Sequence, residues 1–281
     1  MAVDMTVDLM SATVQVEQPL ADGTRTVATG FLVSDPTPDG RPRVVLITAD
    51  HVFEGMPGDQ ATIGYRVKGP GGVWSFAPRQ FPIRAGGKPL WTRSPTRDVA
   101  AIAITAPAAF AKAAIPLAWL AASDTFTKYG VGPGDEMMVL GYPQGLSANA
   151  AGFPILRSGR VASPIEPDKV SPTFLLDFRV FPGNSGGPVF ISQPDHRAPG
   201  SDSAAQPVQF IAGMLTQQVE LNDVRLELGI VTDAEFIRET IAELDQPASQ
   251  SVPAPNARPA EAPALVASRD VSAAVGHAVG D

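Results

Sequence analysis

The sequence predicts an all-β fold, either an antiparallel barrel or a sandwich. Three observations lead to this prediction. The chain has 28 prolines and 26 glycines among 281 residues, as expected for many loops between short strands. Charged residues make up 18%, below the usual share of about 25%, which argues against a coiled coil or a charge-rich disordered chain. Short apolar runs recur along the chain, and long helical patterns do not alternate with them.

Each predicted strand is a short apolar run that ends near a turn signal. Glycine and proline mark these turns because they supply the backbone angles that tight turns need. The turn signals include Asp22-Gly23, Asp39-Gly40, Pro70-Gly71-Gly72 and Pro133-Gly134. The predicted strands are Thr13–Val16, Thr26–Val33, Val44–Thr48, Ala61–Arg66, Val99–Ile104, Met137–Leu140, Phe174–Phe178, Val189–Ile191, Phe210–Leu215 and Leu228–Val231.

One helix is well marked near the end of the folded region. Thr232 and Glu235 have the spacing of a capping box, in which the two side chains satisfy free N–H groups of the first turn. Apolar residues then recur at helical spacing. They are Phe236, Ile237, Ile241 and Leu244. We expect a helix over residues 233–244 that closes the domain.

Two segments have the composition of loops or tails. From Gln246 to Asp281 the chain is rich in alanine and proline and has no aromatic residue. Such a segment buries too little apolar surface to offset its ordering entropy, so we expect a flexible tail over 246–281. Ser192–Pro207 is polar and is predicted to be a loop. Either segment is a candidate for binding a partner.

Composition excludes several classes of function. The net charge of −8 argues against nucleic-acid binding, which needs a basic face to neutralise phosphates. The chain has no cysteine, which excludes a disulfide scaffold, thiolate zinc sites and a cysteine nucleophile. Its three histidines are widely scattered. We therefore expect no metal centre and no cofactor.

Neither a membrane span nor a signal peptide is expected. The nearly apolar stretch Val99–Ala122 contains Pro107, Pro116 and Lys112 and much alanine, so it is predicted to be a buried strand and a loop. The first ten residues, M-A-V-D-M-T-V-D-L-M, lack the basic and apolar regions of a signal peptide. This favours the cytoplasm, unless a leader has been removed.

The strongest local signal for chemistry is the segment P-G-N-S-G-G-P-V at Pro182–Val189. Glycine adopts backbone angles that other residues resist, so a loop of this kind lets the Ser185 hydroxyl stand clear while N–H groups turn toward one point. A nucleophilic serine needs this arrangement, with donors ready for a developing oxyanion. Taken alone, the segment also fits a glycine-rich hairpin turn.

Two further segments support a nucleophilic site. L-I-T-A-D-H-V at Leu46–Val52 ends a predicted strand with His51, and R-D-V-A-A-I at Arg97–Ile102 begins another with Asp98. Alone, such a histidine is usually a surface or core residue, and such an aspartate usually belongs to a turn. With Ser185 they stand in the order His, Asp, Ser along the chain.

With these motifs the chain resembles the trypsin-like (chymotrypsin-fold) serine proteases, and among them the bacterial HtrA-like branch. The resemblance covers roughly residues 13–244. The matching segments are T-G-F-L-V at Thr29–Val33, T-A-D-H-V at Thr48–Val52, D-V-A-A-I at Asp98–Ile102, G-Y-P-Q-G at Gly141–Gly145 and G-N-S-G-G-P at Gly183–Pro188.

The resemblance implies a protease domain over residues 1–245 with two antiparallel six-stranded β-barrels. The first barrel is expected at about 13–122 and the second at about 130–231, with the site in the cleft between them. Ser185 would be the nucleophile, His51 the general base and then acid, and Asp98 the residue that orients the imidazole. The N–H groups of Gly183 and Ser185 would form the oxyanion hole.

The resemblance also implies where substrate lies. Peptide would pair as an extra strand along Thr216, Gln217 and Gln218. The Thr216 hydroxyl stands where the family often anchors the triad aspartate. Arg179 stands where the family often has the residue at the base of the specificity pocket, with Val180 and Phe181 along its wall. Arg179 would bind acidic side chains if it points inward. In that buried position it would need Asp177, Glu227 or substrate as a partner. If it points outward, the pocket would be shallow and apolar, suited to Val, Ala or Leu.

Departures from the family pattern carry their own expectations. Asp50 beside His51 replaces a small or amide residue. A second acid there could raise the pKa of His51, but neighbours on a strand point to opposite faces, which favours no role for Asp50. Asn184 replaces an aspartate that pairs with a new N-terminus in the digestive enzymes, so activation by N-terminal cleavage is not expected. The tail is too short for the PDZ domain usual in HtrA-like proteases. His196 lies in a predicted polar loop and is given no role.

The sequence thus predicts a serine endopeptidase that acts on protein or peptide substrates. A serine esterase of the α/β-hydrolase type would need G-x-S-x-G, alternating strands and helices, and a histidine after the serine. The chain has G-N-S-G-G, but its segments are β-rich and its histidine motif comes before the serine, so this hypothesis is weak. The second hypothesis is a protease-fold binding or scaffold protein, a pseudoprotease whose partners define its role. The filled triad positions argue against it.

Overall fold

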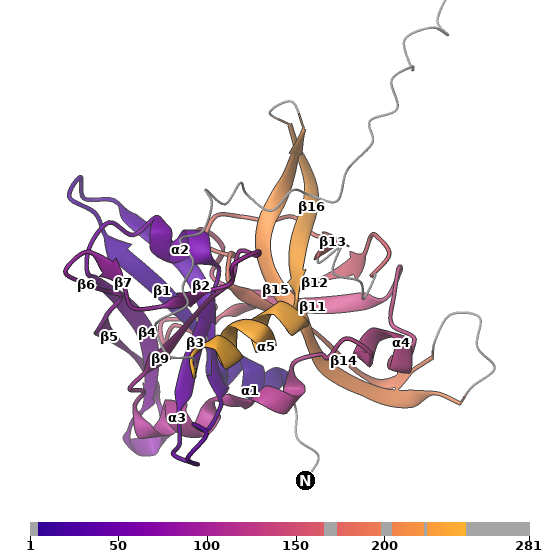
Figure 1. The fold of residues 1–281 in the computed structure, drawn as a ribbon, viewed down its shortest axis with the longest axis horizontal. Coiled ribbons are helices and arrows are strands. Elements are labelled where there is room, and N and C mark those ends of the chain that lie inside the picture. Colours follow the sequence, from indigo (N-terminus) through magenta and orange to yellow (C-terminus); the bar gives the residue numbers. More distant parts are fainter. Residues whose placement is uncertain (1–4, 166–172, 198–203, 222–223, 246–281) are drawn as a thin grey trace, which may run out of the picture.

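The structure, a computed structural model, describes residues 5–165, 173–197, 204–221 and 224–245 (Figure 1). It confirms the predicted all-β class, with strands in both halves of the chain and short helices between them. Buried apolar residues of the two halves form one continuous cluster, so the halves share a core. The predicted tail lies outside the described residues.

The N-terminal half is an eight-stranded sheet. Its strands are β1 (Thr13–Pro19), β2 (Arg25–Ser34), β3 (Val44–Thr48), β4 (Gln60–Lys68), β5 (Trp74–Pro82), β8 (Thr92–Arg93), β9 (Ala100–Ile104) and β10 (Ile115–Pro116). They lie in the order β5-β4-β1-β2-β3-β9-β8, and β10 pairs with β2. Shorter elements connect them. These are α1 (Met5–Ala12), α2 (Asp50–Glu54), η1 (Pro70–Gly72), β6 (Arg84–Ala85), β7 (Lys88–Pro89), α3 (Ala108–Ala113) and η2 (Leu117–Trp119).

The centre of this sheet positions the first part of the site. The β3 sequence V-V-L-I-T is a continuous apolar run, and it is almost fully buried because it lies between β2 and β9. Thr48 at the end of β3 pairs with Ala100 at the start of β9. Since the two strands are antiparallel, the residues after β3 and those before β9 meet at the same edge of the sheet.

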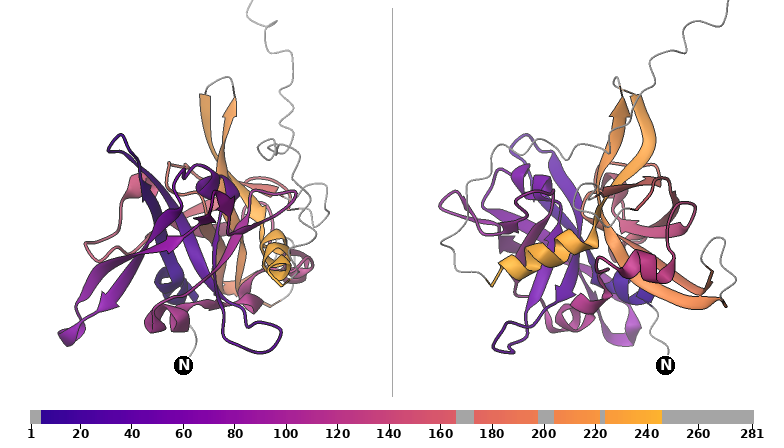
Figure 2. Two further views of the ribbon diagram at one scale, coloured as in Figure 1. Left: turned by 60° about the vertical axis from the view of Figure 1, so that its left-hand side comes forward. Right: turned by 45° about the vertical axis from the view of Figure 1, so that its right-hand side comes forward.

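The C-terminal half is a closed barrel of six strands in the order β11-β12-β13-β16-β15-β14. Its elements are α4 (Thr125–Tyr129), β11 (Glu136–Gly141), η3 (Pro143–Gly145), β12 (Ile155–Val161), β13 (Thr173–Asp177), β14 (Gly187–His196), β15 (Gln206–Leu221) and β16 (Val224–Asp233). The hairpin of β15 and β16 continues beyond the barrel and projects from the body of the molecule in both views of Figure 2.

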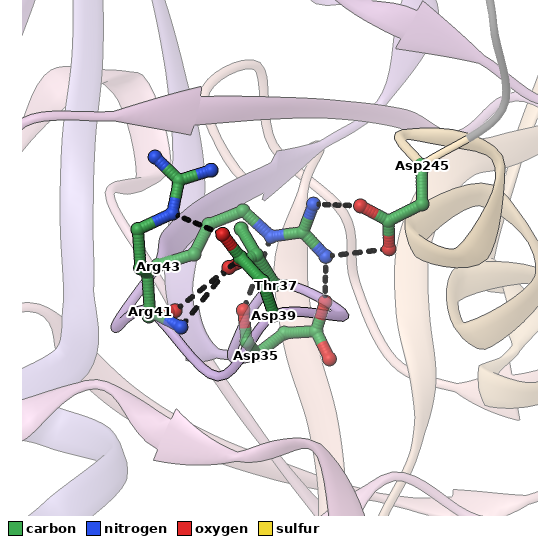
Figure 3. A network of polar contacts seen from close by, with 6 residues as sticks. All are labelled: Asp35, Thr37, Asp39, Arg41, Arg43 and Asp245. Atoms are coloured by element: carbon green, nitrogen blue, oxygen red, sulfur yellow. Dashed lines mark hydrogen bonds and ion pairs between the residues drawn. The ribbon is translucent and has the colours of Figure 1, made fainter.

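Helix α5 (Ala234–Glu243) leaves the barrel after β16 and lies across the N-terminal half (Figure 1). Its far end is held by Arg43, which precedes β3. Arg43 Nη1 and Nη2 lie 2.6 and 3.0 Å from the two carboxylate oxygens of Asp245, and Nη2 also binds Asp35 (Figure 3). A two-point contact of this kind fixes direction as well as distance, so α5 ties the two halves together.

The structure shows elements that the sequence did not predict. Strand β5 was missed because it contains Pro78 and Pro82, which are tolerated there because β5 is the edge strand of its sheet. Strand β12 was missed because it is largely polar and only alternately buried. The predicted loop 192–207 is shorter than expected, since pairing of β14 with β15 continues to His196 and Gln206 across a bulge.

The predicted closing helix is present, but its predicted cap is wrong. Asp233, not Thr232, is the N-cap, and its side chain accepts a hydrogen bond of 2.9 Å from the Glu235 N–H. Thr232 is instead the fully buried partner of Met214 and Thr173 in the barrel. Strand pairing thus continues one residue further than the capping box required. Among the described residues no helix is long and apolar enough to cross a membrane.

Candidate active site

His51 and Asp98 come together at the edge where β3 ends and β9 begins. His51 lies in the one-turn helix α2, and Asp98 comes two residues before β9. One Asp98 carboxylate oxygen lies 2.6 Å from His51 Nδ1, and the other accepts a hydrogen bond of 2.9 Å from the His51 N–H. The carboxylate therefore holds both the ring and the backbone of the histidine, which leaves Nε2 as the nitrogen that can accept a proton.

The surroundings of His51 favour its charged form. Desolvation opposes the imidazolium, but the hydrogen bond and charge of Asp98, followed by the charges of Asp50 and Glu54, outweigh it and raise the pKa of His51. The Asp98 side chain is 10% exposed and that of His51 is 46% exposed. The imidazole is thus accessible from solvent, while its partner carboxylate is largely screened from water.

Asp50 does not act as a second partner of the imidazole. The two residues lie in α2 rather than on a strand, and the Asp50 carboxylate has other partners. One of its oxygens accepts a hydrogen bond of 2.6 Å from Trp91 Nε1, and the other lies 3.5 Å from Arg93. Burial raises the pKa of Asp50, and the bond to Trp91 offsets part of this effect. Asp50 therefore influences His51 through charge alone.

Ser185 lies in the loop that precedes β14, between the two halves. Its N-terminal-half neighbour is Thr29 of β2, whose N–H donates a hydrogen bond of 2.9 Å to the Ser185 carbonyl. The next residue, Gly186, has a φ of 88°, and a Cβ there would lie 2.4 Å from Thr48 Oγ1. The serine loop is thus packed against the end of β3, which leads directly to His51.

The Ser185 hydroxyl donates to the Thr216 carbonyl at 3.0 Å. Among the described residues no hydrogen bond joins it to His51. Hydrogen bonds between catalytic groups are often absent or long without substrate and form in the complex. A change of the Ser185 rotamer is the motion that would redirect the hydroxyl.

The turn before Ser185 has the form needed for an oxyanion hole. Residues 181–184 form a β-turn closed by a hydrogen bond of 3.0 Å from the Asn184 N–H to the Phe181 carbonyl. Pro182 and Gly183 are the central residues, and Gly183 has a φ of 94°, as a type II turn requires. In the described part of the chain, the N–H groups of Gly183 and Ser185 donate to no protein acceptor. Both remain available to an incoming oxygen.

The structure places the predicted specificity residues beside one another, with Arg179 on the surface. Its side chain is 62% exposed, its Nε lies 3.4 Å from Glu227, and its guanidinium lies over the ring of Phe181. Val180 is buried, and its methyl group lies close to Gly229 of β16. The wall of the predicted specificity pocket is therefore apolar at Val180, and the Arg179 cation lies at its outer end.

Thr216, Gln217 and Gln218 lie along an edge of β15. Pairing with β14 ends at Leu215, while pairing with β16 continues through Gln217 and Gln218. The edge beyond Leu215 that faced β14 thus has no partner strand among the described residues. The expected anchor of Asp98 is absent, because the Thr216 hydroxyl binds the Ile230 carbonyl at 3.2 Å and lies 3.4 Å from Thr232 Oγ1.

His196 differs from its expected surface position. Its side chain is 2% exposed and its Nε2 lies 3.2 Å from Asp135, at the far end of β14. It takes no part in the site around Ser185. Elsewhere too, the described residues contain no cluster of three or more histidine, cysteine, aspartate or glutamate side chains suited to a metal ion.

Comparisons with known proteins agree with this geometry. The model of the trypsin-like peptidase domain family matches residues 28–195, which include His51, Asp98 and Ser185. A comparison with curated proteins returned no match. Among solved structures, a variant of the HtrA-type protease AlgW with a tripeptide aligns with a TM-score of 0.52 at 15% identity. The alignment covers 86% of this chain and 62% of that one, so it establishes a shared fold over part of the longer protein.

Two further solved structures align over a similar part of the chain. The HtrA-type protease AlgW with a decapeptide has 16% identity and a TM-score of 0.49, with 86% of this chain and 67% of that chain covered. The active form of the Rv3671c protease from M. tuberculosis has 19% identity and a TM-score of 0.48, with 87% and 85% covered.

Proposed function

The chain belongs to the trypsin-like peptidase family, and on that basis we propose that it is a serine endopeptidase with Ser185 as nucleophile, His51 as base and Asp98 as the orienting acid. The observation that supports this most is the pair of hydrogen bonds between the Asp98 carboxylate and His51, one at Nδ1 and one at the backbone N–H. The contact at Nδ1 selects the tautomer in which Nε2 is free to take the serine proton.

The proposed reaction runs through an acyl-enzyme. As Ser185 Oγ attacks the scissile carbonyl carbon, its proton passes to His51 Nε2, and the carbonyl oxygen takes the negative charge between the N–H groups of Gly183 and Ser185. His51 then gives the proton to the leaving amine as the C–N bond breaks. Water then gives a proton to His51 as it attacks the ester carbon, and the imidazolium returns that proton to Ser185 Oγ as the C–Oγ bond breaks and the acid leaves. Losing one oxyanion donor typically costs about 3–4 kcal/mol of transition-state stabilisation.

Substrate would bind as an extended peptide along the unpaired edge of β15 at Thr216, Gln217 and Gln218. Main-chain hydrogen bonds to such an edge do not depend on the substrate's sequence. The preference for particular substrate side chains must therefore come from the residues of the adjoining pocket wall. That wall contains buried Val180 and half-buried Phe181, with Arg179 paired to Glu227 at the surface. We propose that small aliphatic side chains fit before the scissile bond.

Labelling with a fluorophosphonate probe tests this proposal. The wild-type chain should react, and Ser185→Ala should not. The control variant Ser192→Ala, which removes a half-buried serine hydroxyl on β14, should react like the wild type. A pseudoprotease would leave all three chains unlabelled, and that result would overturn the proposal in favour of a binding role.

A further inference from the structure

The oxyanion turn is held by its two carbonyl groups, and the holding groups come from outside the turn. The Pro182 carbonyl accepts a hydrogen bond of 2.6 Å from the Gln144 N–H, and the Gly183 carbonyl accepts one of 2.7 Å from Thr29 Oγ1. In a trans peptide the N–H points opposite to the C=O. Fixing the Pro182 carbonyl on one side therefore directs the Gly183 N–H to the other.

Thr29 is the residue through which the N-terminal half reaches this turn. It lies on β2, is fully buried, and uses all its polar groups there. Its hydroxyl donates to Gly183 and accepts a hydrogen bond of 3.1 Å from the Tyr142 N–H. Its own N–H donates to the Ser185 carbonyl, and its carbonyl accepts from the Thr48 hydroxyl at 2.8 Å.

The packing around these contacts leaves little freedom. A Cβ on Gly183 would lie 2.2 Å from the Tyr142 carbonyl, and one on Gly186 would lie 2.0 Å from the Thr29 carbonyl. Such distances are shorter than any real contact, so the backbone of the turn already touches its neighbours. The remaining freedom is rotation of single peptide groups, which glycine permits in both directions.

The residue beside the nucleophile contributes no charge to this support. Asn184 is buried, and its Oδ1 has no hydrogen-bond partner among the described residues. An amide cannot form an ion pair with an ammonium group. The Gly183–Asn184 peptide, which lies between the peptides that carry the two oxyanion donors, is therefore held through its carbonyl. Its contact to Thr29 is made by a side chain and can be removed by substitution.

We propose that Thr29 is a positioning residue for catalysis, whose hydroxyl holds the Gly183 carbonyl and so fixes the Gly183–Asn184 peptide, which lies between the peptides that carry the Gly183 and Ser185 N–H groups. This inference rests on the proposed function, because it concerns the same reaction. Without the hydroxyl, the Gly183 carbonyl and the Tyr142 N–H lose a shared partner. The Gly183–Asn184 peptide is then free to rotate, and the donors on either side of it are less firmly oriented. Donors contribute most when they are oriented before the charge develops.

The variant Thr29→Val tests the proposal, because it keeps the shape of the side chain and removes the hydroxyl. Thr29→Ser restores the hydroxyl. Thr240→Val is the matched control, since Thr240 is equally buried and its hydroxyl also binds one backbone carbonyl, that of Phe236 at 2.7 Å, in α5. Each variant is assayed on a fluorogenic peptide amide, and its inhibition by the peptide aldehyde of the same sequence is measured.

We expect Thr29→Val to lower kcat by about 10- to 100-fold, less than the 10²- to 10³-fold loss typical of deleting an oxyanion donor. KM should change by less than about twofold, because the β15 edge is untouched. The aldehyde, whose hemiacetal oxygen occupies the oxyanion position, should bind more weakly by the same factor as kcat falls. Thr29→Ser should recover most of the loss, and Thr240→Val should match the wild type.

Several results would overturn the inference. One is a kcat for Thr29→Val within twofold of Thr240→Val, and another is a loss that appears in KM alone. A shift of the acid limb of the pH profile would mean that the substitution acts through His51. If Thr29→Val does not fold, Thr29→Cys, a much weaker donor, is compared with Thr29→Ser, and equal kcat values contradict the proposal. A wild-type chain that fails to label with fluorophosphonate overturns the proposed function itself, whatever Thr29 does.

Discussion

The two halves of the molecule assemble their parts of the site in different ways. His51 follows the end of β3 and Asp98 precedes the start of β9, and these two strands are neighbours in one sheet, so a single strand register sets their meeting point. Ser185 stands in a loop of the barrel, but the groups that hold its loop include Thr29 of the other half. The proposed acid-base pair is therefore built within one half, whereas the proposed nucleophile and oxyanion turn depend on how the two halves fit.

This difference separates two kinds of defect. A change at His51 or Asp98 removes chemistry and leaves the fit of the halves intact. A change at the contact between the halves disturbs the oxyanion turn and the stability of the whole chain together. The predictions below run from the largest expected effect to the smallest.

Removing a triad residue should have the largest effect on activity and little effect on folding. We expect Ser185→Ala or His51→Ala to lower kcat by about 10⁴-fold or more, and the double variant to be little worse, because the triad acts as a unit. Asp98→Asn should also be severe, since an amide no longer selects the required tautomer. Single-turnover assays and thermal melts measure both quantities. Multiplicative losses in the double variant would show that the two residues act independently.

Arg66 is a second buried contact between the halves. It lies on β4 and is 2% exposed, and it donates hydrogen bonds to the Tyr142 hydroxyl and the Gly152 carbonyl in the other half. It also binds the carbonyls of Ser11 and Thr13 at 2.7 and 2.8 Å. The charge is thus balanced by hydroxyl and carbonyl oxygens. Burial lowers the pKa of Arg66, as expected for a cation without a carboxylate partner.

Replacing Arg66 with methionine should destabilise the chain by about 3 kcal/mol or more, because several buried acceptors lose their donor at once. Since Tyr142 contacts Thr29 and Gly183, kcat should fall as well. Tyr142→Phe is the finer test, as it removes one hydroxyl and should cost about 1–2 kcal/mol. Chemical denaturation measures these values. Equal stability of the wild type and Arg66→Met would show that this contact does not hold the halves together.

The contact at the end of α5 should contribute less. Arg43 is 10% exposed and joins Asp35 to Asp245, so Arg43→Ala leaves two carboxylates facing one another. We expect a loss of about 1–2 kcal/mol in the free energy of unfolding, with kcat on a small peptide almost unchanged. The exposed pair of Arg41 and Asp39 in the same turn is the control, and Arg41→Ala should cost almost nothing. A similar loss in both variants would contradict the role given to Asp245.

The sequence could predict the features that are set by local motifs, but not the contacts between the two halves. Motifs with fixed local chemistry, such as the glycines around Ser185 and the apolar strand before His51, indicated the family and the candidate triad. The contacts between the halves were not visible, because Thr29 and Arg66 look like ordinary strand residues and acquire their partners only from distant segments. The N-cap of α5 was also assigned to the wrong residue, because Thr232 pairs with Thr173 of a distant strand in the barrel.

The smallest predicted effect concerns the pH dependence of the acid-base pair. His51 accepts a proton only when neutral, so its raised pKa should place the acid limb of kcat/KM above the ordinary histidine value of 6.5. Asp98 contributes most to this increase, then Asp50, then Glu54.

The variant Asp50→Asn keeps an acceptor for Trp91 but removes a negative charge, and the positive charge of Arg93 is then less neutralised. Both changes disfavour the imidazolium, so the acid limb should move to lower pH. Glu54→Gln, the matched control one turn away, should move it less in the same direction. An upward shift in Asp50→Asn would show that Asp50 does not act on His51 through its charge.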